Sequence, residues 1–333
     1  MKERPEPRGE APLDDVERMM RELVSAEIPG RGGQMVMEQL TSGGKRLRPR
    51  IVLAAAEALR VPRRTAVAWA VAIELLHNAT LVHDDVQDGD RFRRGRPTVW
   101  ARHGAAQAIN AGDAMLMLPF LALRSLQPSE RGILSSVLAA YSVETVRGQI
   151  AELDLLPNEQ LDWESYLSAA AGKTGALFAL PVVGVAALAG LDEEEARDMG
   201  APFDRLGVAF QVMDDVRDLY GKKGRNVVGS DLREGKVSAL VVTHLERCPQ
   251  DRRWLLEVLG ASRESTPEAG VERAITAFRE SGALALALER ARRLRDEAEG
   301  SPVFENYPAL RKVLAGLADA CSAPADLMLQ GVA

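Results

Sequence analysis

The stretch 176-ALFALPVVGVAALAGL-191 is the longest apolar run in the sequence, and it points to the class of fold. It is rich in alanine and leucine and is interrupted by Pro181 and by glycines. A membrane span needs about 18 or more uninterrupted apolar residues. A helix over about residues 174–189, buried inside a protein core, therefore explains the run better than a membrane span.

Helical periodicity recurs along almost the whole chain, and short breaks rich in Gly, Pro, Asn or Asp separate the periodic segments. There is no alternating strand pattern and no strand–helix–strand rhythm, so we predict an all-α fold. We expect one domain over residues 13–333, preceded by a disordered tail at 1–12. Helices are predicted over about 14–27, 48–59, 64–83, 103–125, 130–151, 162–171, 174–189, 193–219, 236–247, 251–260, 267–280, 282–298 and 307–320.

Composition narrows the function. The net charge of −6 argues against a nucleic-acid partner. Two cysteines, Cys248 and Cys321, provide neither a disulfide framework nor a cysteine zinc site, which favours a cytoplasmic protein. Because no apolar run is long and unbroken, we expect no integral membrane segment.

Two segments share one acidic pattern. Asp-Asp-x-x-Asp occurs in 82-VHDDVQDGD-90 and again in 210-FQVMDDVRDLYG-221. On a helix, residues four apart share a face, so Asp84 points with Asp88 while Asp85 turns aside, and Asp214 points with Asp218. One such motif could be a solvated helix end. Two motifs, each after an apolar helix, favour magnesium bound by carboxylates together with substrate phosphates.

Basic residues accompany the acidic motifs. In 93-RRGRPT-98 two arginines follow the first motif, and guanidinium groups bind phosphate oxygens in pairs. In 42-SGGKRLRPRI-51 a Gly-Gly turn precedes several cations at a predicted helix start, where backbone N–H groups favour anions. That loop alone could be an ordinary basic helix cap. The segments 171-AGKTGALF-178 and 231-DLREGK-236 add further cations and a hydroxyl group.

In this order, the motifs resemble those of the trans-isoprenyl diphosphate synthases, the polyprenyl synthetase family. The resemblance spans about residues 40–240. The matching pieces are GGKRLRP at 43–49, HNATLVHDDVQD at 77–88, RRGRPT at 93–98, GQ at 148–149, KT at 173–174, FQVMDDVRD at 210–218 and SDLREGK at 230–236.

The resemblance implies an isoprenoid synthase fold, in which many helices surround a deep apolar cavity, and a homodimer. It also implies a reaction. An allylic diphosphate ionises, isopentenyl diphosphate attacks the cation, and a proton is lost to the departing diphosphate. About three magnesium ions are expected with that diphosphate.

The resemblance also assigns roles to residues. Asp84, Asp88 and Asp214 would bind magnesium, and Asp85 and Asp218 would assist them through water or neighbouring groups. The catalytic residues would be Lys173, Thr174, which would lie beside the ionising C–O bond, and Gln211. The allylic diphosphate would be held by Arg93, Lys173, Gln211 and Lys236, and isopentenyl diphosphate by Lys45, Arg48, His77 and Arg94.

The sequence departs from the family pattern in one loop, 221-GKKGRNVVGSD-231. Members usually carry a lysine four or five residues before the aspartate of the SDLREGK-type motif. This chain has no lysine at either position, and valines stand at 227 and 228. Lys222, Lys223 or Arg225 would take its place.

Product length should depend on positions just before the first motif. Leu76, Ala79 and Thr80 lie eight, five and four residues before Asp84, and short-chain members usually carry an aromatic residue at the fifth or fourth position. Without such a plug, elongation can continue, since each buried methylene contributes about 0.8 kcal/mol. We predict a product of geranylgeranyl length or longer, and within that range the expectation centres on about five to eight isoprene units. Deeper plugs are possible at Leu76 or on the next helix, at Met115, Leu116, Met117 and Phe120.

Alternatives remain. The product could stop at farnesyl or geranylgeranyl diphosphate. A non-catalytic subunit of a heteromeric synthase usually lacks one aspartate motif, and both are intact here. A metal phosphohydrolase built on 83-HDD-85 would need more histidines than the four present. A terpene cyclase would not need Lys45, Arg48 and Arg94.

Overall fold

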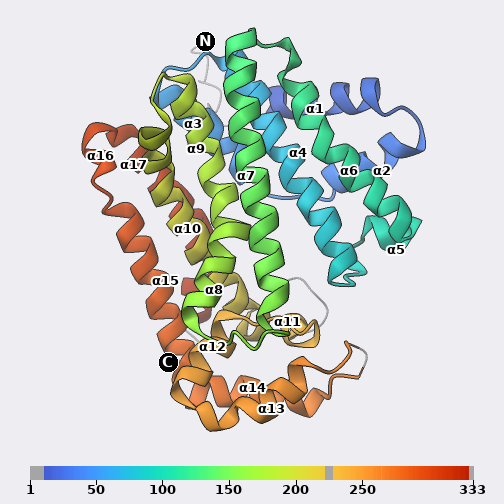
Figure 1. The fold of residues 1–333 in the computed structure, drawn as a ribbon, viewed down its shortest axis with the longest axis vertical. Coiled ribbons are helices and arrows are strands. Elements are labelled where there is room, and N and C mark those ends of the chain that lie inside the picture. The colour runs from blue at the N-terminus through green and yellow to red at the C-terminus, as the bar shows by residue number, and fades with distance from the viewer. Residues whose placement is uncertain (1–10, 222–227, 264, 330–333) are drawn as a thin grey trace, which may run out of the picture. The chain divides into compact units, whose positions relative to one another are not determined.

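The computed structural model describes residues 11–221, 228–263 and 265–329. The predicted tail, 1–12, falls mostly outside these residues, and its last two residues begin the first helix. The loop cations Lys222, Lys223 and Arg225 also lie outside them. The chain divides into two compact units: residues 1–138 with 181–196, and residues 139–180 with 197–333. Each unit is helical (Figure 1).

The first unit is centred on α4 (Arg63–Gln87), which packs mainly against α1, α3 and α6. Around α4 the chain forms α1 (Ala11–Glu27), α2 (Arg31–Leu40), α3 (Leu47–Ala58), β1 (Phe92–Arg93), β2 (Arg96–Pro97), α5 (Val99–His103), α6 (Ala105–Ala122), the 3-10 turn Leu123–Ser125 and the start of α7 (Pro128–Leu155).

The predicted buried helix is α9 (Ala176–Leu188). Its C-terminal half belongs to the first unit, where Trp69 of α4 is fully buried and donates its indole N–H to the carbonyl of Pro181 at 3.2 Å. A Cβ atom on Gly184 would come within 2.4 Å of the Trp69 ring. The glycine that interrupts the apolar run therefore makes room for the largest core side chain of α4.

The second unit contains the rest of α7 and the first half of α9, with α10 (Glu193–Tyr220) beginning in the first unit. Its core is formed by Leu, Val and Ala side chains of α8, α10, α12, α14 and α15. Its other elements are α8 (Trp163–Ala170), the π-helical segment Ala171–Gly175, α11 (Ser230–Arg233), α12 (Ala239–Arg247), the 3-10 turn Pro249–Asp251, α13 (Arg252–Leu259), α14 (Glu268–Glu280), α15 (Ala283–Glu299), α16 (Val303–Asn306) and α17 (Pro308–Leu329).

Most predicted helices are confirmed within a few residues, but the periodicity missed α2, α5, α11 and α16. Three of these are too short to show a period. In α2, two early glycines hide the pattern, although Gly33 is needed there because a Cβ would come within 2.2 Å of the Ile28 carbonyl oxygen. The β1–β2 hairpin was also not predicted. It pairs two residues with two, and its turn residues Arg94 and Gly95 both have positive φ.

Three helical stretches in the described chain are long and apolar enough to cross a membrane: Arg63–Gln87, Ala105–Ser125 and Trp163–Leu188. The criterion of an unbroken apolar run missed them. The most apolar windows of the first and third are 83% and 78% buried inside the protein, whereas that of the second is 44% buried. The expectation of no membrane segment stays a prediction. Ala105–Ser125 exposes apolar side chains to its surroundings.

Candidate active site

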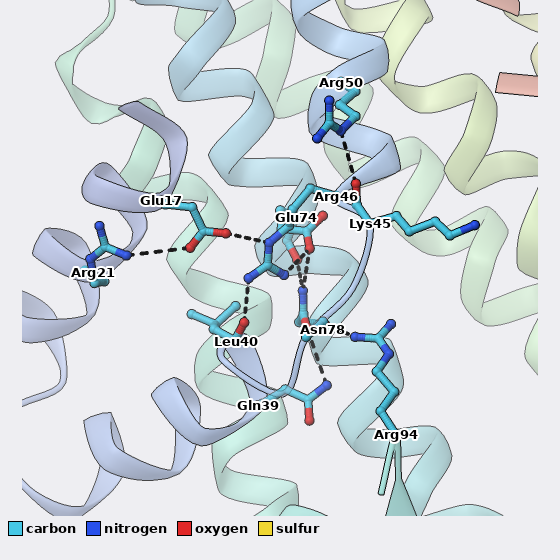
Figure 2. Close-up of polar contacts among 11 residues, drawn as sticks. Glu17, Arg21, Gln39, Leu40, Lys45, Arg46, Arg50, Glu74, Asn78 and Arg94 are labelled. Atoms are coloured by element: carbon cyan, nitrogen blue, oxygen red, sulfur yellow. Dashed lines mark hydrogen bonds and ion pairs between the residues drawn. The ribbon is translucent and has the colours of Figure 1, made fainter. Parts of the chain in front are cut away.

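The predicted phosphate-binding loop lies between α2 and α3 in the first unit, and its two adjacent cations have different surroundings. Lys45 is exposed, whereas the side chain of Arg46 is only 12% exposed. Arg46 donates from Nε to Glu17 at 2.6 Å, from Nη1 to Glu74 at 2.7 Å and from Nη2 to the carbonyl oxygen of Leu40 (Figure 2). Burial by itself would lower the pKa of Arg46, but the two carboxylates outweigh it and raise the pKa.

The Arg46 contact extends into α4 through buried amides. Asn78 donates to Glu74 Oε1 at 3.1 Å and accepts from Gln39 of α2 at 3.3 Å (Figure 2). Glu74 is thus held by two donors, and burying it is tolerable because it has partners. The network ties α1, α2 and α4 to Arg46, the residue that precedes α3.

Arg94, in the β1–β2 turn, reaches the same loop and hydrogen-bonds to the carbonyl oxygen of Gly43 (Figure 2). Gly44 has φ of +136°, and a Cβ there would lie 2.8 Å from Arg94 Nη1. The Gly-Gly pair therefore lets a guanidinium group lie against the backbone. Burial lowers the pKa of Arg94, and the nearby charges of Arg93 and Arg46 lower it further.

His77 of α4 lies among these cations. Burial lowers the pKa of its imidazole well below the usual range. The pKa falls further because of four neighbouring guanidinium groups, those of Arg48, Arg94, Arg93 and Arg46. Its Nδ1 is buried without a hydrogen-bond partner. Neutral His77 keeps one ring N–H that can donate to an anion. The first unit thus brings together the predicted residues Arg48, His77 and Arg94, with Lys45 on the same loop.

The first aspartate motif ends α4. Asp84 and Asp88 are half-buried, and the N–H of Asp88 donates to the carbonyl oxygen of Asp84 at 2.8 Å. Asp85 turns inward, as its position in the helix predicts, and its side chain is 2% exposed. It accepts from Arg93 Nε at 2.7 Å. Burial raises the pKa of Asp85 to about 6, although the charge of Arg93 opposes the rise.

The neighbouring histidine and the predicted length-determining residues also lie on α4. The His83 ring fits against Gly112 of α6, where a Cβ would come within 2.2 Å of Nε2. Leu76 and Ala79 are buried, and Thr80 is half-buried with its hydroxyl group donating to the carbonyl oxygen of His77 at 2.8 Å.

The structure separates the candidate plugs on α6. Met115 is fully buried, and α6 packs against α4. Met117 and Phe120 are exposed, because the helix turns them away from the core. The expectation that Met117 and Phe120 are plugs inside this chain is therefore wrong, whereas Leu116 is half-buried.

In the second unit, Lys173 and Thr174 lie in the π-helical segment, a form of helix that often marks functional sites. A Cβ on Gly148 of α7 would come within 2.0 Å of the Lys173 backbone nitrogen. The glycine of the GQ pair thus permits backbone-to-backbone packing. Lys173 Nζ pairs with Glu152, one turn after Gly148.

A chain of hydrogen bonds fixes the remaining predicted catalytic residues. Thr174 donates to Gln211 Oε1 at 2.9 Å, and Gln211 Nε2 donates to Asp215 at 2.9 Å. Asp215 is 5% exposed and also accepts from the Tyr166 hydroxyl group and from the Ala239 N–H, each at 2.8 Å. Burial raises the pKa of Tyr166 well above its usual range, and the adjacent Asp215 charge adds to the rise. Tyr166 therefore stays protonated as a donor.

The second motif ends differently from the first. Asp214 is half-buried, but Asp218 is 3% exposed. The Asp218 carboxylate accepts from the Ser230 hydroxyl group at 2.6 Å and from the Asp231 N–H at 3.0 Å. It therefore caps the N-terminus of α11, the start of the SDLREGK segment.

At the other end of that segment, Lys236 pairs with the buried Glu234 at 2.8 Å, and Arg263 approaches the same carboxyl group at 3.2 Å. Arg263 comes from outside every recognised motif. The predicted phosphate ligands Arg93, Lys173 and Lys236 thus each have a carboxylate partner that a bound diphosphate could replace.

A separate trio of residues carries metal-ligand atoms within 4.8 Å of one another: His244, Cys248 and Asp251. The buried His244 ring bonds to Ser281 Oγ and to Asp251, each at 2.9 Å. These bonds account for both ring nitrogens, so His244 has a structural role.

The sequence pattern of the Polyprenyl synthetase family matches residues 33–278, more than half of this chain. The chain belongs to the polyprenyl synthetase family. A geranylgeranyl pyrophosphate synthase from Geoglobus acetivorans is 35% identical over 308 residues, which cover 91% of this chain and 94% of that relative.

Solved structures agree with this assignment. A geranylgeranyl pyrophosphate synthetase from Pyrococcus horikoshii Ot3 is 31% identical with a TM-score of 0.80, covering 93% of this chain and 95% of that one. A decaprenyl diphosphate synthase from Rhodobacter capsulatus is 28% identical with a TM-score of 0.82, over the same shares. The predicted all-α isoprenoid synthase fold and the predicted class of enzyme, a prenyl diphosphate synthase, are confirmed.

Sequence reasoning missed several residues of this polyprenyl synthetase site. Tyr166 and Glu152 lie outside the recognised motifs, and their roles follow from contacts with Asp215 and Lys173. Asp215 was visible as the middle aspartate of the second motif. Its side chain turns away from Asp214 and Asp218, and that direction was a signal for an internal partner.

Proposed function

We propose that this enzyme condenses isopentenyl diphosphate with an allylic diphosphate in the trans, head-to-tail sense. The observation that carries the proposal is the basic cluster of the first unit, where the buried Nδ1 of His77 has no hydrogen-bond partner and Arg94 lies against the Gly43 carbonyl oxygen. A diphosphate would satisfy that cluster, and Lys45, Arg48, His77 and Arg94 are its proposed ligands for isopentenyl diphosphate. A terpene cyclase has no use for such a site.

Magnesium fits the carboxylates that remain at the surface. Asp84, Asp88 and Asp214 offer oxygen ligands and are half-buried, which suits a hard cation that keeps water molecules. Asp85 and Asp218 are turned to Arg93 and to α11, so their proposed role is to orient the motifs. Magnesium, when bound, would neutralise the diphosphate charge that grows as the allylic C–O bond breaks.

The allylic diphosphate is the proposed ligand of Arg93, Lys173, Gln211 and Lys236. In the second unit, Thr174 and Gln211 are held by hydrogen bonds, so their dipoles are oriented before substrate arrives. When the C–O bond breaks, the alkene of isopentenyl diphosphate forms the new C–C bond. The proton then lost passes to the released diphosphate.

We infer a product of geranylgeranyl length or longer. Ala79 is small, and the Geoglobus relative is a geranylgeranyl pyrophosphate synthase. The fold alone does not set the length, since a decaprenyl diphosphate synthase shares it. We expect Ala79→Phe to shorten the product to farnesyl or geranyl diphosphate. An unchanged length in a variant with an unchanged melting temperature would contradict the role of Ala79.

We propose that the enzyme is a homodimer. In the second half of α7, four large apolar side chains are exposed at helical spacing: Val143, Val146, Ile150 and Leu153. On α6, Ile109, Met117 and Phe120 are exposed as well. Such stripes on a folded chain indicate an interface, and the spacing on α7 suits another helix. Val146→Glu with Ile150→Glu should give a monomer by light scattering, and a dimer that persists would reject this face.

The function is tested by product analysis. Purified full-length protein is incubated with magnesium, isopentenyl diphosphate and, separately, dimethylallyl, geranyl and farnesyl diphosphates, and the dephosphorylated alcohols are sized by mass spectrometry. We expect elongated alcohols from the chain alone. Diphosphate release without incorporation of isopentenyl diphosphate would instead indicate a cyclase, and no turnover would indicate a subunit that needs a partner. Location in the cytoplasm stays a prediction.

A further inference from the structure

Arg46 is a cation of the phosphate-binding loop whose guanidinium group is used inside the protein. It follows the exposed Lys45 directly, yet its guanidinium group is directed into the first unit (Figure 2). Its three donors reach three separate elements: Glu17 of α1, Leu40 at the end of α2 and Glu74 of α4. A residue bound in this way is not available to a substrate phosphate.

The backbone of Arg46 is in the left-handed region, with φ of 49° and ψ of 43°. That conformation is unfavourable for a residue with a side chain, and it persists where surrounding contacts impose it. The carbonyl oxygen of the same residue accepts from the Arg50 N–H at 3.2 Å, which is the first hydrogen bond of α3. The side-chain contacts of Arg46 thus fix the point and direction at which α3 begins.

The position of that first turn matters for anion binding. Arg46 is the residue that precedes α3, and its side chain does not cap the helix. Arg48 lies in the first turn, and Lys45 lies one residue before Arg46. The orientation of both cations, and of the N–H groups between them, therefore follows the backbone of Arg46.

We propose that Arg46 is a positioning residue for isopentenyl diphosphate. Its fork of hydrogen bonds holds the loop in the conformation that presents Lys45 and Arg48 to the diphosphate, without itself touching the substrate. The proposal rests on the proposed function of this site. Arg46 then differs from Lys45 and Arg48. Replacing either of these ligands removes one contact with the diphosphate, whereas breaking the hydrogen bonds of Arg46 displaces both ligands together.

Arg46→Lys tests the proposal because lysine keeps the charge but cannot bond to three acceptors at once. We expect KM for isopentenyl diphosphate to rise about ten-fold or more, the factor for losing one charge-assisted hydrogen bond. KM for the allylic diphosphate should stay within about two-fold, because its proposed ligands lie on other elements. Calorimetric titration of isopentenyl diphosphate should show the same loss of affinity without any turnover.

Glu17→Gln is a milder second variant, because Glu17 is more exposed than Glu74. It should raise KM for isopentenyl diphosphate in the same direction by a smaller factor. Arg21→Lys is the matched control: Arg21 pairs with the same Glu17 at 3.8 Å but is 57% exposed, so both KM values should stay unchanged.

The outcomes separate the two proposals. Arg46→Lys could lower the melting temperature and leave both KM values unchanged, or raise both equally. Either result would make Arg46 a purely structural residue and overturn this inference, with the function of the enzyme intact. If the wild-type protein neither binds nor incorporates isopentenyl diphosphate, the proposed function itself fails, and the inference fails with it.

Discussion

The last aspartate of the first motif, Asp88, is half-buried at the end of α4, whereas its counterpart in the second motif, Asp218, is 3% exposed and caps α11. The spacing within the two motifs is identical. What differs is the chain that follows. The chain continues from α4 into a short hairpin, whereas in the second unit the N-terminus of α11 meets the Asp218 carboxylate and uses it as a cap.

The middle aspartates differ as well. Asp85 is buried against a cation, Arg93, whereas Asp215 is buried among neutral donors from Tyr166, Gln211 and Ala239. A cation that is also a proposed diphosphate ligand can leave Asp85 when substrate binds. Of the donors to Asp215, Gln211 is also a proposed diphosphate ligand, whereas the Tyr166 hydroxyl group and the Ala239 N–H have no proposed contact with substrate. We infer that Asp85 loses its partner when substrate binds, whereas Asp215 keeps its hydrogen bonds from Tyr166 and Ala239.

The largest effects should come from the aspartates that the two motifs share as proposed metal ligands. Asp84→Asn and Asp214→Asn should each lower kcat by about 100-fold to 1,000-fold, the range for removing one group that stabilises developing charge. Both side chains are half-buried, so the melting temperature should change little. Steady-state kinetics at saturating magnesium measures kcat for both variants. If kcat falls by less than about ten-fold in either variant, the two motifs do not have equivalent roles in catalysis.

Asp88→Asn and Asp218→Asn test the difference between the motifs. Asp218→Asn should lower the free energy of unfolding by about 1–3 kcal/mol, because a buried carboxylate that caps α11 is weakened. Asp88→Asn should change it by less than about 0.5 kcal/mol and should raise the magnesium concentration needed for activity. Urea unfolding of the two variants gives the comparison, and equal losses would show that Asp218 is not a structural cap.

Tyr166→Phe tests whether the second motif is fixed by its neutral donors. Losing one hydrogen bond to Asp215 should lower kcat by about three-fold to ten-fold, since Gln211 and Thr174 depend on the same carboxylate. Tyr220→Phe is the control, because it removes a hydrogen bond of 2.7 Å to the Ile275 carbonyl oxygen within the same unit. It should affect stability alone, and a similar kcat loss in both variants would refute the positioning role.

The smallest effect concerns Asp204, which lies on α10 like the second motif. Burial raises the pKa of Asp204 to about 6, and the charge of Arg205 opposes the rise. Because this pKa exceeds the unfolded value, protonated Asp204 favours the folded state below about pH 4, and that contribution is lost as the pH rises through 6. Asp204→Asn should therefore raise the melting temperature by about 2–4 °C at pH 8 and leave it unchanged near pH 4. Scanning calorimetry of the wild type and the variant at the two pH values measures this difference in melting temperature. An equal rise at both pH values would exclude titration of Asp204 as its cause.

The sequence by itself determined the all-α fold, most helix positions, the family and the class of reaction. These follow from local patterns: apolar periodicity needs only neighbouring residues, and the motifs are contiguous letters such as GGKRLRP and HDDVQD. That Asp85 points away from Asp84 and Asp88 was also predictable, because helical spacing places it on another face, whereas its burial came from the structure.

The tertiary structure alone decided which charged groups are used internally. Lys45 and Arg46 are adjacent cations, and only the approach of Glu17, Leu40 and Glu74 separates their roles. Only the meeting of α10 with α11 makes Asp218 a cap, and only the fold brings Tyr166 to Asp215 across 49 positions. A hydrogen bond between distant residues leaves no local pattern in the sequence, and for that reason these assignments had to wait for the structure.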